Sequence, residues 1–403
     1  MRVLYFSLRE CWPTDTGARL RDFHLAKGLA RNSDLHYLGL IPAKENLSGP
    51  PPEDSLFRSY TIAAKPPANS LLSLLRGLIG PQPLVVLNNF SAHISRTLRS
   101  ILGTHGPFDT VQIEGVHLAP YCRLIRELSP QSAIVADWHN IESEIMHRFA
   151  ANTSNIAKKL YAHRTARLIE RSESYLLREA TVNCVTSERE KRILSPIASP
   201  GTALEVIPNG VDCSWFASCP GPDRECQDLL YVGSMDYHAN IDAVLYFCRE
   251  IWPFIRQRHP QSRFLIVGRR PDLAVQALAG IPGVVITGTV EDVRPYYAKA
   301  AILVVPLRVG GGTRLKILEA MAAGVPVISS PLGAEGIEAE RGLHWVEATS
   351  MESWVSAVGS LLGNLNQRQS MANSARRLVK SRYDWEAISS RLVAIHQRVS
   401  RSG

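Results

Sequence analysis

The amino-acid sequence predicts an α/β protein with two doubly wound domains, each built on a parallel sheet. Short apolar runs, which are typical of buried strands, alternate with longer amphipathic stretches, which are typical of helices. The alternation begins again after residue 206, at the segment Ile207–Asp212, where Pro208 and the Asn209–Gly210 pair favour a sharp turn. Two such series, separated by a turn, indicate two domains.

The first domain, residues 1–205, contains five apolar runs that we expect to be buried strands. These strands are Val3–Ser7, Leu35–Leu40, Thr110–Glu114, Ser132–Asp137 and Thr181–Ser187, and the helices between them are expected at 17–31, 91–103, 118–129 and 155–179. Residues 41–83 carry eight prolines and are expected to be irregular, apart from a short apolar helix at 71–79.

The second domain, residues 206–384, repeats the same alternation. Its strands are expected at Asp228–Gly233, Arg263–Gly268, Val284–Thr287, Ala301–Pro306 and Pro326–Ser330, and its helices at 240–258, 272–279, 292–299, 314–323, 351–363 and 367–382. Ligands of doubly wound sheets bind outside the carboxyl ends of the strands. We therefore look for functional residues in the loops that follow the strands.

The composition excludes several classes of protein. With 45% hydrophobic and 20% charged residues the chain is neither disordered nor fibrous, and its apolar runs are far shorter than the ~20 residues of a membrane span. No signal peptide is evident, so a cytoplasmic location is expected. The seven cysteines form no Cys-x-x-Cys pair, which argues against a disulfide framework or a zinc site. The net charge of +8 is spread over both domains, which suits an anionic ligand or membrane surface better than a nucleic acid.

A glycine-rich loop marks the strongest candidate site. Gly310, Gly311 and Gly312 lie between an expected strand and a helix that begins near Thr313. Backbone N–H groups at such a helix start bind anions, and the cations Arg314 and Lys316 oppose the helix dipole there, which indicates that an anion lies between them. Further along, the Glu319 carboxylate can accept hydrogen bonds from the hydroxyls of a ribose. Together these features predict a nucleoside diphosphate site; the alternative is a glycine-rich loop with a solvated charged helix face.

Other nucleotide motifs are missing. The loop lacks the Gly-Lys-Ser/Thr of a P-loop, and no Gly-x-Gly-x-x-Gly follows the first strand, which disfavours a nicotinamide-dependent enzyme.

Seven further motifs occur in a characteristic order and spacing. They are Pro13–Arg19, Asp137–Asn140, Ile207–Asp212, Tyr231–Ser234, Ile266–Arg269, Thr287–Asp292 and Lys316–Val327. In this order they make nearly the whole chain resemble the retaining glycosyltransferases of family 4. That resemblance implies the GT-B fold, in which two Rossmann-like domains face each other across a cleft. It also implies that the final helix, 385–403, crosses back to the N-terminal domain, as Tyr383–Trp385 followed by a helix suggests.

The resemblance implies transfer of a sugar from a nucleotide-diphosphate sugar to a saccharide or lipid-linked acceptor, with retention of anomeric configuration and without a metal or other cofactor. The donor is expected in the C-terminal domain. Of the family's paired glutamates, the second falls on Glu319 and the first would fall on Gly311. The family's Arg and Lys after the first strand of this domain are also absent, so Lys316, with Arg314 or Arg308, is expected to supply the charge.

The resemblance also implies a set of donor contacts. Arg269 is expected to stack on the base, whose edge the backbone of Thr289 and Val290 would contact. The full set of expected donor-binding residues is Gly17, Arg19, Gly233, Arg269, Thr289, Val290, Gly310, Gly311, Gly312, Thr313, Arg314 and Leu315.

Three residues are expected to be catalytic: His139, Lys316 and Glu319. His139 follows a strand, and a histidine near the donor sugar is common in the family. Glu114, also at a strand end, could orient the acceptor hydroxyl; a purely structural role is the alternative for His139 and Glu114. No carboxylate pair with glycosidase roles is evident, so the leaving phosphate would accept the acceptor proton.

Two questions stay open at this point. Lys158–Arg178 carries six basic and two acidic residues, which predicts either a solvated helix or, with the 71–79 segment, a contact with the anionic inner face of the plasma membrane. The family's commonest use is cell-envelope polysaccharide or glycolipid synthesis. The alternatives to a transferase are a sugar-nucleotide epimerase or hydrolase of the same fold, and a non-catalytic sugar-nucleotide-binding protein.

Overall fold

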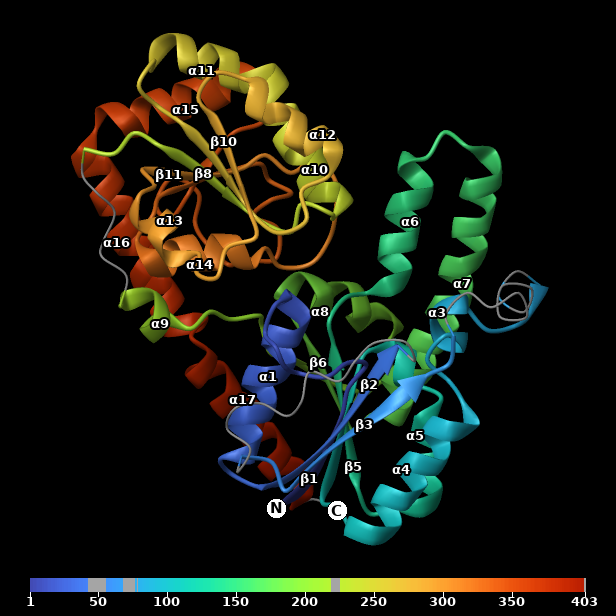
Figure 1. Cartoon of the computed structure of the whole chain (residues 1–403). Helices are drawn as coiled ribbons and strands as arrows, with labels where there is room; N and C mark the ends of the chain where they lie inside the picture. The colour runs from blue at the N-terminus through green and yellow to red at the C-terminus, as the bar shows by residue number, and fades with distance from the viewer. Residues whose placement is uncertain (43–55, 68–76, 78, 219–224, 402–403) are drawn as a thin grey trace. The chain divides into compact units, whose positions relative to one another are not determined.

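The computed structural model describes residues 1–42, 56–67, 77, 79–218 and 225–401, and the chain divides into two compact units. Unit 1 comprises Met1–Pro208 with Ile388–Gly403, and unit 2 comprises Asn209–Ala387. Each unit is built on a wholly parallel sheet with helices between its strands (Figure 1). The predicted α/β class is thereby confirmed.

Unit 1 has a seven-stranded sheet in the order β3-β2-β1-β4-β5-β6-β7. The order reverses between β1 and β4, so the loops after these two strands diverge and leave room for a ligand or for functional side chains at their carboxyl ends. The strands are β1 Arg2–Phe6, β2 Asp34–Pro42, β3 Ser59–Lys65, β4 Thr110–Glu114, β5 Ala133–Trp138, β6 Val182–Val185 and β7 Ala203–Val206.

The expectation that 41–83 is irregular is wrong for strand β3. This strand pairs with β2 from His36–Ser59 to Pro42–Lys65. It lies at the edge of the sheet and is mostly half-buried, so it lacks the apolar run by which a buried strand is found in a sequence. The short apolar helix expected at 71–79 lies outside the described residues, apart from Gly77 and Ile79.

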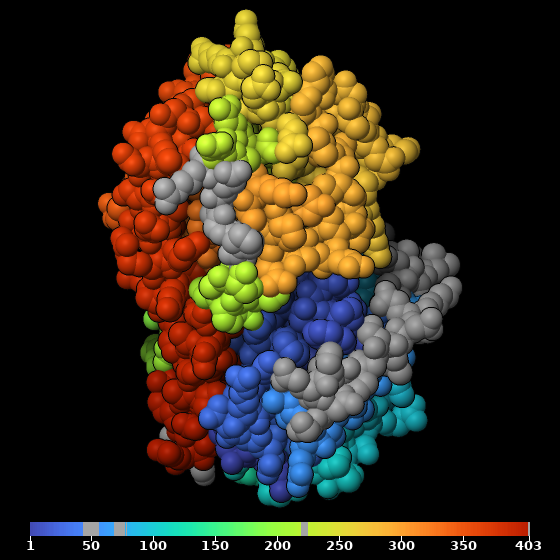
Figure 2. All heavy atoms as spheres, turned by 60° about the vertical axis from the view of Figure 1, so that its left-hand side comes forward, coloured from blue at the N-terminus to red at the C-terminus, as the bar shows by residue number. Residues whose placement is uncertain are grey.

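The helices of unit 1 cover both faces of its sheet. One apolar cluster joins the strands to α4, α5 and α7. On another side of the unit α17 meets α1, where a Cβ on Gly28 would collide with Ser389; Figure 2 shows the dark red of the last helix beside the blue of the N-terminal residues. The helical segments are α1 Gly17–Ala30, α3 Leu84–Leu87, α4 Ala92–His105, a 3₁₀ turn at Val116–Leu118, α5 Tyr121–Leu128, α6 Glu142–Asn152, α7 Ile156–Glu179, α8 Glu188–Leu194, a 3₁₀ turn at Ser195–Ile197 and α17 Trp385–Ser400.

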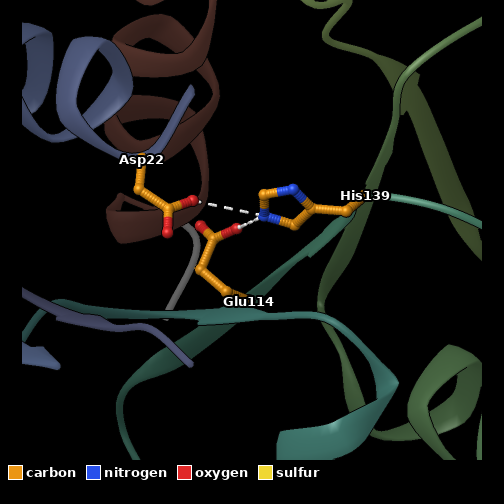
Figure 3. Close-up of side chains that lie close together, drawn as sticks. All are labelled: Asp22, Glu114 and His139. Carbon is orange, nitrogen blue, oxygen red and sulfur yellow. Dashed lines mark hydrogen bonds and ion pairs between the residues drawn. The ribbon is translucent and has the colours of Figure 1, made fainter. Parts of the chain in front are cut away.

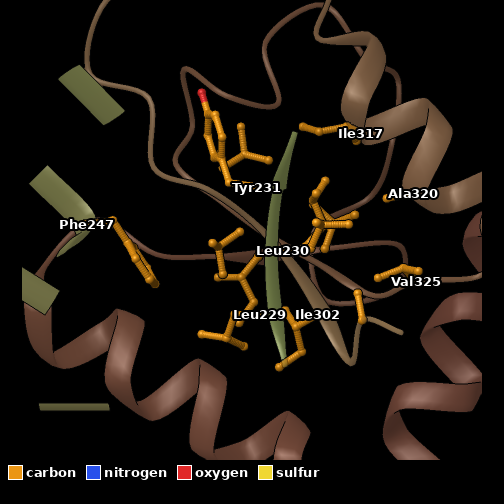
Figure 4. Close-up of a cluster of buried hydrophobic side chains, with 14 of the residues drawn as sticks. Leu229, Leu230, Tyr231, Phe247, Ile302, Ile317, Ala320 and Val325 are labelled. Carbon is orange, nitrogen blue, oxygen red and sulfur yellow. The ribbon is translucent and has the colours of Figure 1, made fainter. Parts of the chain in front are cut away.

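Unit 2 has a six-stranded sheet in the order β10-β9-β8-β11-β12-β13. Figure 4 shows apolar side chains of β8, β11 and α14 packed together, among them Leu230, Ile302 and Ile317. The strands are β8 Leu229–Val232, β9 Phe264–Val267, β10 Val284–Gly288, β11 Ile302–Val305, β12 Val327–Ser329 and β13 Val346–Glu347.

The helices of unit 2 match the expected positions closely. The helix expected at 240–258 is interrupted by one π-helical stretch, Phe247–Ile251. The remaining segments are α9 Cys213–Ala217, α10 His238–Tyr246, α11 Trp252–Arg258, α12 Leu273–Gln276, a 3₁₀ turn at Ala277–Gly280, α13 Arg294–Ala298, α14 Leu315–Ala323, α15 Met351–Gly363 and α16 Leu365–Arg382. Among the described residues, no helix combines the length and the hydropathy that a membrane crossing requires.

Candidate functional site

Unit 1 brings three ionisable side chains together near the carboxyl ends of its central strands. Asp22 comes from α1, Glu114 is the last residue of β4, and His139 directly follows β5. The Nε2 atom of His139 lies 2.6 Å from Glu114 Oε2 and 3.2 Å from Asp22 Oδ1 (Figure 3). Both carboxylates therefore hold the same nitrogen of the imidazole ring.

Further contacts fix the two carboxylates. Asp22 Oδ2 accepts hydrogen bonds from the Ser7 hydroxyl at 2.7 Å and from Arg9 at 3.1 Å. Asp22 and Glu114 are fully buried, whereas the His139 side chain is 16% exposed. Within the described part of the chain, no hydrogen bond is made by His139 Nδ1, which points away from both carboxylates in Figure 3. One ring nitrogen is thus anchored and the other is left for a ligand.

The arrangement favours a charged imidazole. Burial by itself lowers the pKa of His139, but the hydrogen bonds and charges of Asp22 and Glu114 outweigh it and raise this pKa to about 9. Burial raises the pKa of Glu114 to about 7, helped by the nearby charges of Asp137 and Asp22. Burial also acts to raise the pKa of Asp22, but Arg9 and His139 more than offset it, and this pKa is lowered. Near neutral pH the imidazolium can therefore donate a hydrogen bond from Nδ1.

The same three side chains are the candidate metal ligands of the described residues, since their ligand atoms all lie within 4.8 Å of one another. Carboxylate and imidazole are suitable ligands for several divalent cations. A cation here would compete with the Arg9 guanidinium and with the protonated His139 for the same carboxylate oxygens. The contacts present fit a histidine-centred hydrogen-bonding site better than a metal centre.

Unit 2 contains the second candidate group, at the start of α14. The glycine loop follows β11, Gly310 and Gly312 have positive φ angles of 113° and 77°, and Arg314 occupies the N-cap position. Positive φ is readily adopted by glycine only. This backbone geometry explains two of the three glycines and places the following turn of α14 directly behind the loop.

Two half-buried side chains of α14, Lys316 and Glu319, meet partners from strand β8 and from helices α10 and α13. The Lys316 Nζ donates to Asn240 Oδ1 at 2.9 Å and lies 3.9 Å from the centroid of the Tyr231 ring. The Glu319 Oε2 accepts a hydrogen bond from the Tyr297 hydroxyl at 2.8 Å. A Cβ at Gly233 would lie 2.8 Å from Asn240 Nδ2 and 2.9 Å from Lys316 Nζ, so these side chains would have to shift if the glycine were replaced.

Burial changes the ionisation of this pair. Burial, followed by the charge of Arg314, lowers the pKa of Lys316 to about 7. Burial likewise raises the pKa of Glu319, against the opposing effects of Tyr297 and Lys316. An anion bound close to Lys316 would favour its charged form and so restore the positive charge that burial disfavours.

The other expected cations of unit 2 have partners. Arg308 forms an ion pair with Asp242 and lies over the ring of Tyr246. Arg314 donates from its guanidinium to the carbonyl of Gly311, and Arg269 donates to the Ser234 hydroxyl at 3.1 Å. Lys316 is therefore the expected cation that the structure places beside Gly233.

The remaining expected residues lie at the starts of α1 and α14 and directly after β10. Gly17 is the first residue of α1, whose N-cap is Thr16, and Arg19 forms ion pairs with Asp15 and Glu10. Thr313 and Leu315 flank the N-cap of α14, and Thr289 and Val290 follow β10.

Sequence reasoning missed several partners of these residues, namely Asp22, Gln112, Asn240 and Tyr297. One signal was present: Thr110, Gln112 and Glu114 alternate with apolar residues in a strand expected to be buried, which the structure places at the centre of its sheet. Polar side chains at every second position of such a strand must find partners, and so point to a polar network.

Part of unit 2 is similar to a known protein family. Residues 226–364 match the family model described as glycosyl transferases group 1. The chain is 31% identical over 218 residues to phosphatidyl-myo-inositol mannosyltransferase of Mycolicibacterium smegmatis, covering 50% of this chain and 54% of that protein. It is 26% identical over 254 residues to glycogen synthase of Mycobacterium tuberculosis, covering 59% and 58%. The chain thus spans a little over half the length of the curated relatives it matches.

Solved structures share the fold over the full length of the chain. Sucrose-phosphate synthase from Thermosynechococcus elongatus aligns with a TM-score of 0.76 at 17% identity, covering 100% of both chains. HepE of Anabaena, in complex with UDP and glucose, aligns with a TM-score of 0.67 at 14% identity, covering 99% of this chain and 100% of that one.

Proposed function

We propose, since residues 226–364 match the family model of glycosyl transferases group 1, that this chain transfers a sugar from a nucleoside diphosphate sugar to a saccharide or lipid-linked acceptor, with retention of anomeric configuration. The named activities of two relatives, a mannosyltransferase and a glycogen synthase, support sugar transfer. A structural neighbour in complex with UDP-glucose supports the class of donor. Assembly of a cell-envelope polysaccharide or glycolipid is the setting that we propose.

One observation carries the proposal: a half-buried lysine and a half-buried glutamate on the first turns of α14, directly after a glycine loop. Backbone N–H groups at Gly310–Gly312 and the Lys316 ammonium suit a diphosphate, and Glu319 suits the two hydroxyls of a ribose. The Tyr297 hydroxyl donates to one oxygen of that carboxylate, Oε2. One helix and the loop before it therefore carry groups that suit both parts of a nucleoside diphosphate.

We propose that catalysis then consists mainly of positioning and charge stabilisation. As the bond to the sugar breaks, negative charge develops on the leaving diphosphate, which Lys316 and the loop N–H groups stabilise. The acceptor oxygen bonds to the sugar as the bond to the diphosphate breaks, and a diphosphate oxygen accepts the proton of the acceptor hydroxyl, so no protein carboxylate is needed as the base. In unit 1 the His139 Nδ1–H donates a hydrogen bond to a hydroxyl of a saccharide substrate, and Glu114 holds the imidazole.

Replacing Lys316 with alanine should weaken donor binding by about 10- to 150-fold, the range that corresponds to a hydrogen bond with a charged group of ~1.5–3 kcal/mol. Binding should also take up a proton above pH 7, because bound diphosphate raises the lowered pKa of Lys316. Calorimetry with UDP-, GDP- and ADP-sugars, in buffers of different ionisation enthalpy, measures both effects.

Arg341→Ala is the matched control for Lys316, since it removes a cation of unit 2 that is paired with Glu347 at the surface. Donor affinity equal to wild type in the Lys316 variant would contradict the proposed site. Product analysis separates the alternatives: an epimerase or hydrolase turns over the donor without an acceptor, and a non-catalytic binding protein turns over nothing.

We further propose that unit 1 contacts an anionic membrane surface, which would place the enzyme at the inner face of the plasma membrane. The helices α6 and α7 form a hairpin that extends from the sheet (Figure 1). Near its end Phe149, Ile156 and Leu160 are 48%, 75% and 66% exposed. Residues 145–171 contain six Lys or Arg and one acidic residue, Glu170. Exposed apolar side chains among cations favour an interface with anionic lipid.

A second segment adds to this surface. Arg164 of α7 donates to the carbonyls of Gly77 and Gly80, at 2.8 and 2.6 Å. It thereby holds Ile79, which is 80% exposed, beside the hairpin. The apolar side chains of two chain segments thus lie around one cationic helix.

Replacing Lys158 and Lys159 together with alanine should weaken binding to vesicles that contain phosphatidylglycerol by about 30-fold, since each cation near such a surface contributes ~1 kcal/mol. Co-sedimentation at low salt measures the partition, and vesicles of phosphatidylcholine alone should bind less. Arg249 and Arg258, exposed cations of unit 2, give the matched double-alanine control. Absence of wild-type binding to anionic vesicles would refute the membrane contact.

A further inference from the structure

Strand β4 presents a row of polar side chains inside unit 1. Thr110, Gln112 and Glu114 lie at alternate positions and therefore on one face of the strand, whereas Val111 and Ile113 lie on the other. All three polar residues have no exposed surface, and β4 is the central strand of its sheet. Because buried polar groups without partners are costly, each of them needs a hydrogen bond inside the protein.

Helix α17 supplies the partner at one end of this row. His396, which is fully buried, places Nδ1 at 2.7 Å from Thr110 Oγ1 and Nε2 at 2.8 Å from Gln112 Oε1. The amide of Gln112 donates to Glu114 Oε1 at 2.7 Å. The other oxygen of Glu114 contacts His139 Nε2. An unbroken series of hydrogen bonds thus connects His396 to His139 within unit 1.

The chemistry of the groups fixes the direction of these bonds. An ionised Glu114 can only accept, so the NH₂ group of Gln112 must face it and the amide oxygen must face His396. That oxygen needs a donor, which requires the hydrogen of His396 to be on Nε2, while Nδ1 accepts from the Thr110 hydroxyl. A neutral ring fits, because burial lowers the pKa of His396 to about 3.

We infer that Gln112 and His396 are positioning residues that hold the Glu114 carboxylate, and through it the imidazole of His139, in the orientation that leaves Nδ1 toward a ligand. Gln112 occupies Oε1, so Oε2 is the oxygen left for His139. Without this donor the carboxylate could rotate, and its ionised form would be less stable. The inference rests on the proposed function only for its effect on turnover.

Two other carboxylates near Glu114 and His139 have ion-pair partners of their own. Asp22 of α1 is held by Arg9, and Asp137 of β5 by Arg21. The buried Tyr5 of β1 interacts with Glu114 through space, and His117 and Glu142 interact in the same way with His139. The hydrogen bonds of Gln112 and His396 go to Thr110, to Glu114 and to each other, and to none of these seven residues. Tyr5 lies opposite Gln112 in the sheet register, but a change at His139 would still report on the series of hydrogen bonds.

The wild-type protein provides the first test. In ¹⁵N-histidine NMR spectra without substrate, His396 should be neutral with its hydrogen on Nε2 at pH 8–9, where Glu114 is ionised and the pH lies far above the lowered pKa of His396. The tautomer with its hydrogen on Nδ1 would overturn the inference, because its Nε2 could not donate to the amide oxygen of Gln112.

The variants Gln112→Leu and His396→Phe provide the second test. Each should lower the pKa of His139 by about one unit, as expected when Glu114 loses a hydrogen bond to its charged form and becomes less ionised. The kcat for sugar transfer should fall about tenfold with KM unchanged. His396→Gln, whose amide can still donate to Gln112, should restore both values toward wild type.

His36→Phe is the matched control, since His36 is also a buried, neutral histidine of unit 1, and Ser59 is its only hydrogen-bond partner among the described residues. If Gln112→Leu, His396→Phe and His36→Phe all lower the stability of the protein but leave the pKa of His139 unchanged, Gln112 and His396 have a purely structural role. A shifted pKa in a protein that transfers no sugar would leave the inference standing and refute the proposed function instead.

Discussion

Replacing His139 with alanine should lower the kcat of sugar transfer by about 10²- to 10³-fold, the effect of removing one positioned donor from a transition state. A merely structural histidine would use both ring nitrogens. In His139 two carboxylates hold Nε2, whereas Nδ1 has no partner among the described residues, which favours a role toward a ligand. Donor affinity, measured by calorimetry, should change little, since the proposed diphosphate contacts lie in unit 2.

The pH dependence of the wild-type enzyme gives the same prediction a second readout. Asp22 and Glu114 keep the hydrogen on Nε2, so deprotonation of the imidazolium removes the hydrogen from Nδ1. The pKa of His139 is raised to about 9, and kcat should therefore fall as the pH rises through this value. The alanine variant should lose this fall.

His147→Ala provides the control for His139, because this histidine lies on α6 and pairs with Glu170 at the surface. Its kcat should equal that of wild type. A His139 variant that retains kcat within a factor of about ten, or that shows the wild-type fall at high pH, would contradict a catalytic role.

The sequence predicted the strands of the sheets well where the strands are buried. Thr110–Glu114, for example, has the expected bounds, because a buried strand of a parallel sheet must be apolar on at least one face. Strand β3 was missed, since an edge strand gains its stability from backbone pairing with β2 and needs no apolar run. The prediction therefore failed where the backbone, rather than side chains, determines the element.

The candidate sites were predictable residue by residue but not as groups. Glu114 and His139 follow from their positions at strand ends, whereas Asp22 belongs to the helix after β1 and meets them only because the sheet reverses its order between β1 and β4. Likewise His396 reaches β4 only through the return of α17 to unit 1. Such contacts depend on tertiary packing, which no local pattern contains.

Arg21→Leu should be the most destabilising single substitution that we propose, with a loss of about 3–5 kcal/mol in the free energy of unfolding. Arg21 is fully buried and forms a two-point ion pair with Asp137, through Nε at 2.8 Å and the terminal NH₂ at 2.5 Å. It also donates to the carbonyls of Ile207 and Pro208, at 2.8 and 2.9 Å. Leucine fills the space but leaves a carboxylate and two carbonyls buried without these partners.

Urea unfolding, followed by the exchange of amide hydrogens in β1, β4 and β5, measures this loss for unit 1 alone. The surface pair of Arg398 with Glu205 gives the control, and Arg398→Leu should cost no more than about 1 kcal/mol. Replacing Arg21 and Asp137 together with apolar residues should restore part of the lost stability, because the unpaired buried charge is then gone. If Arg21→Leu lowers the free energy of unfolding by no more than Arg398→Leu does, the buried pair does not hold residues 207–208 to the sheet. Other contacts must then fix these two residues.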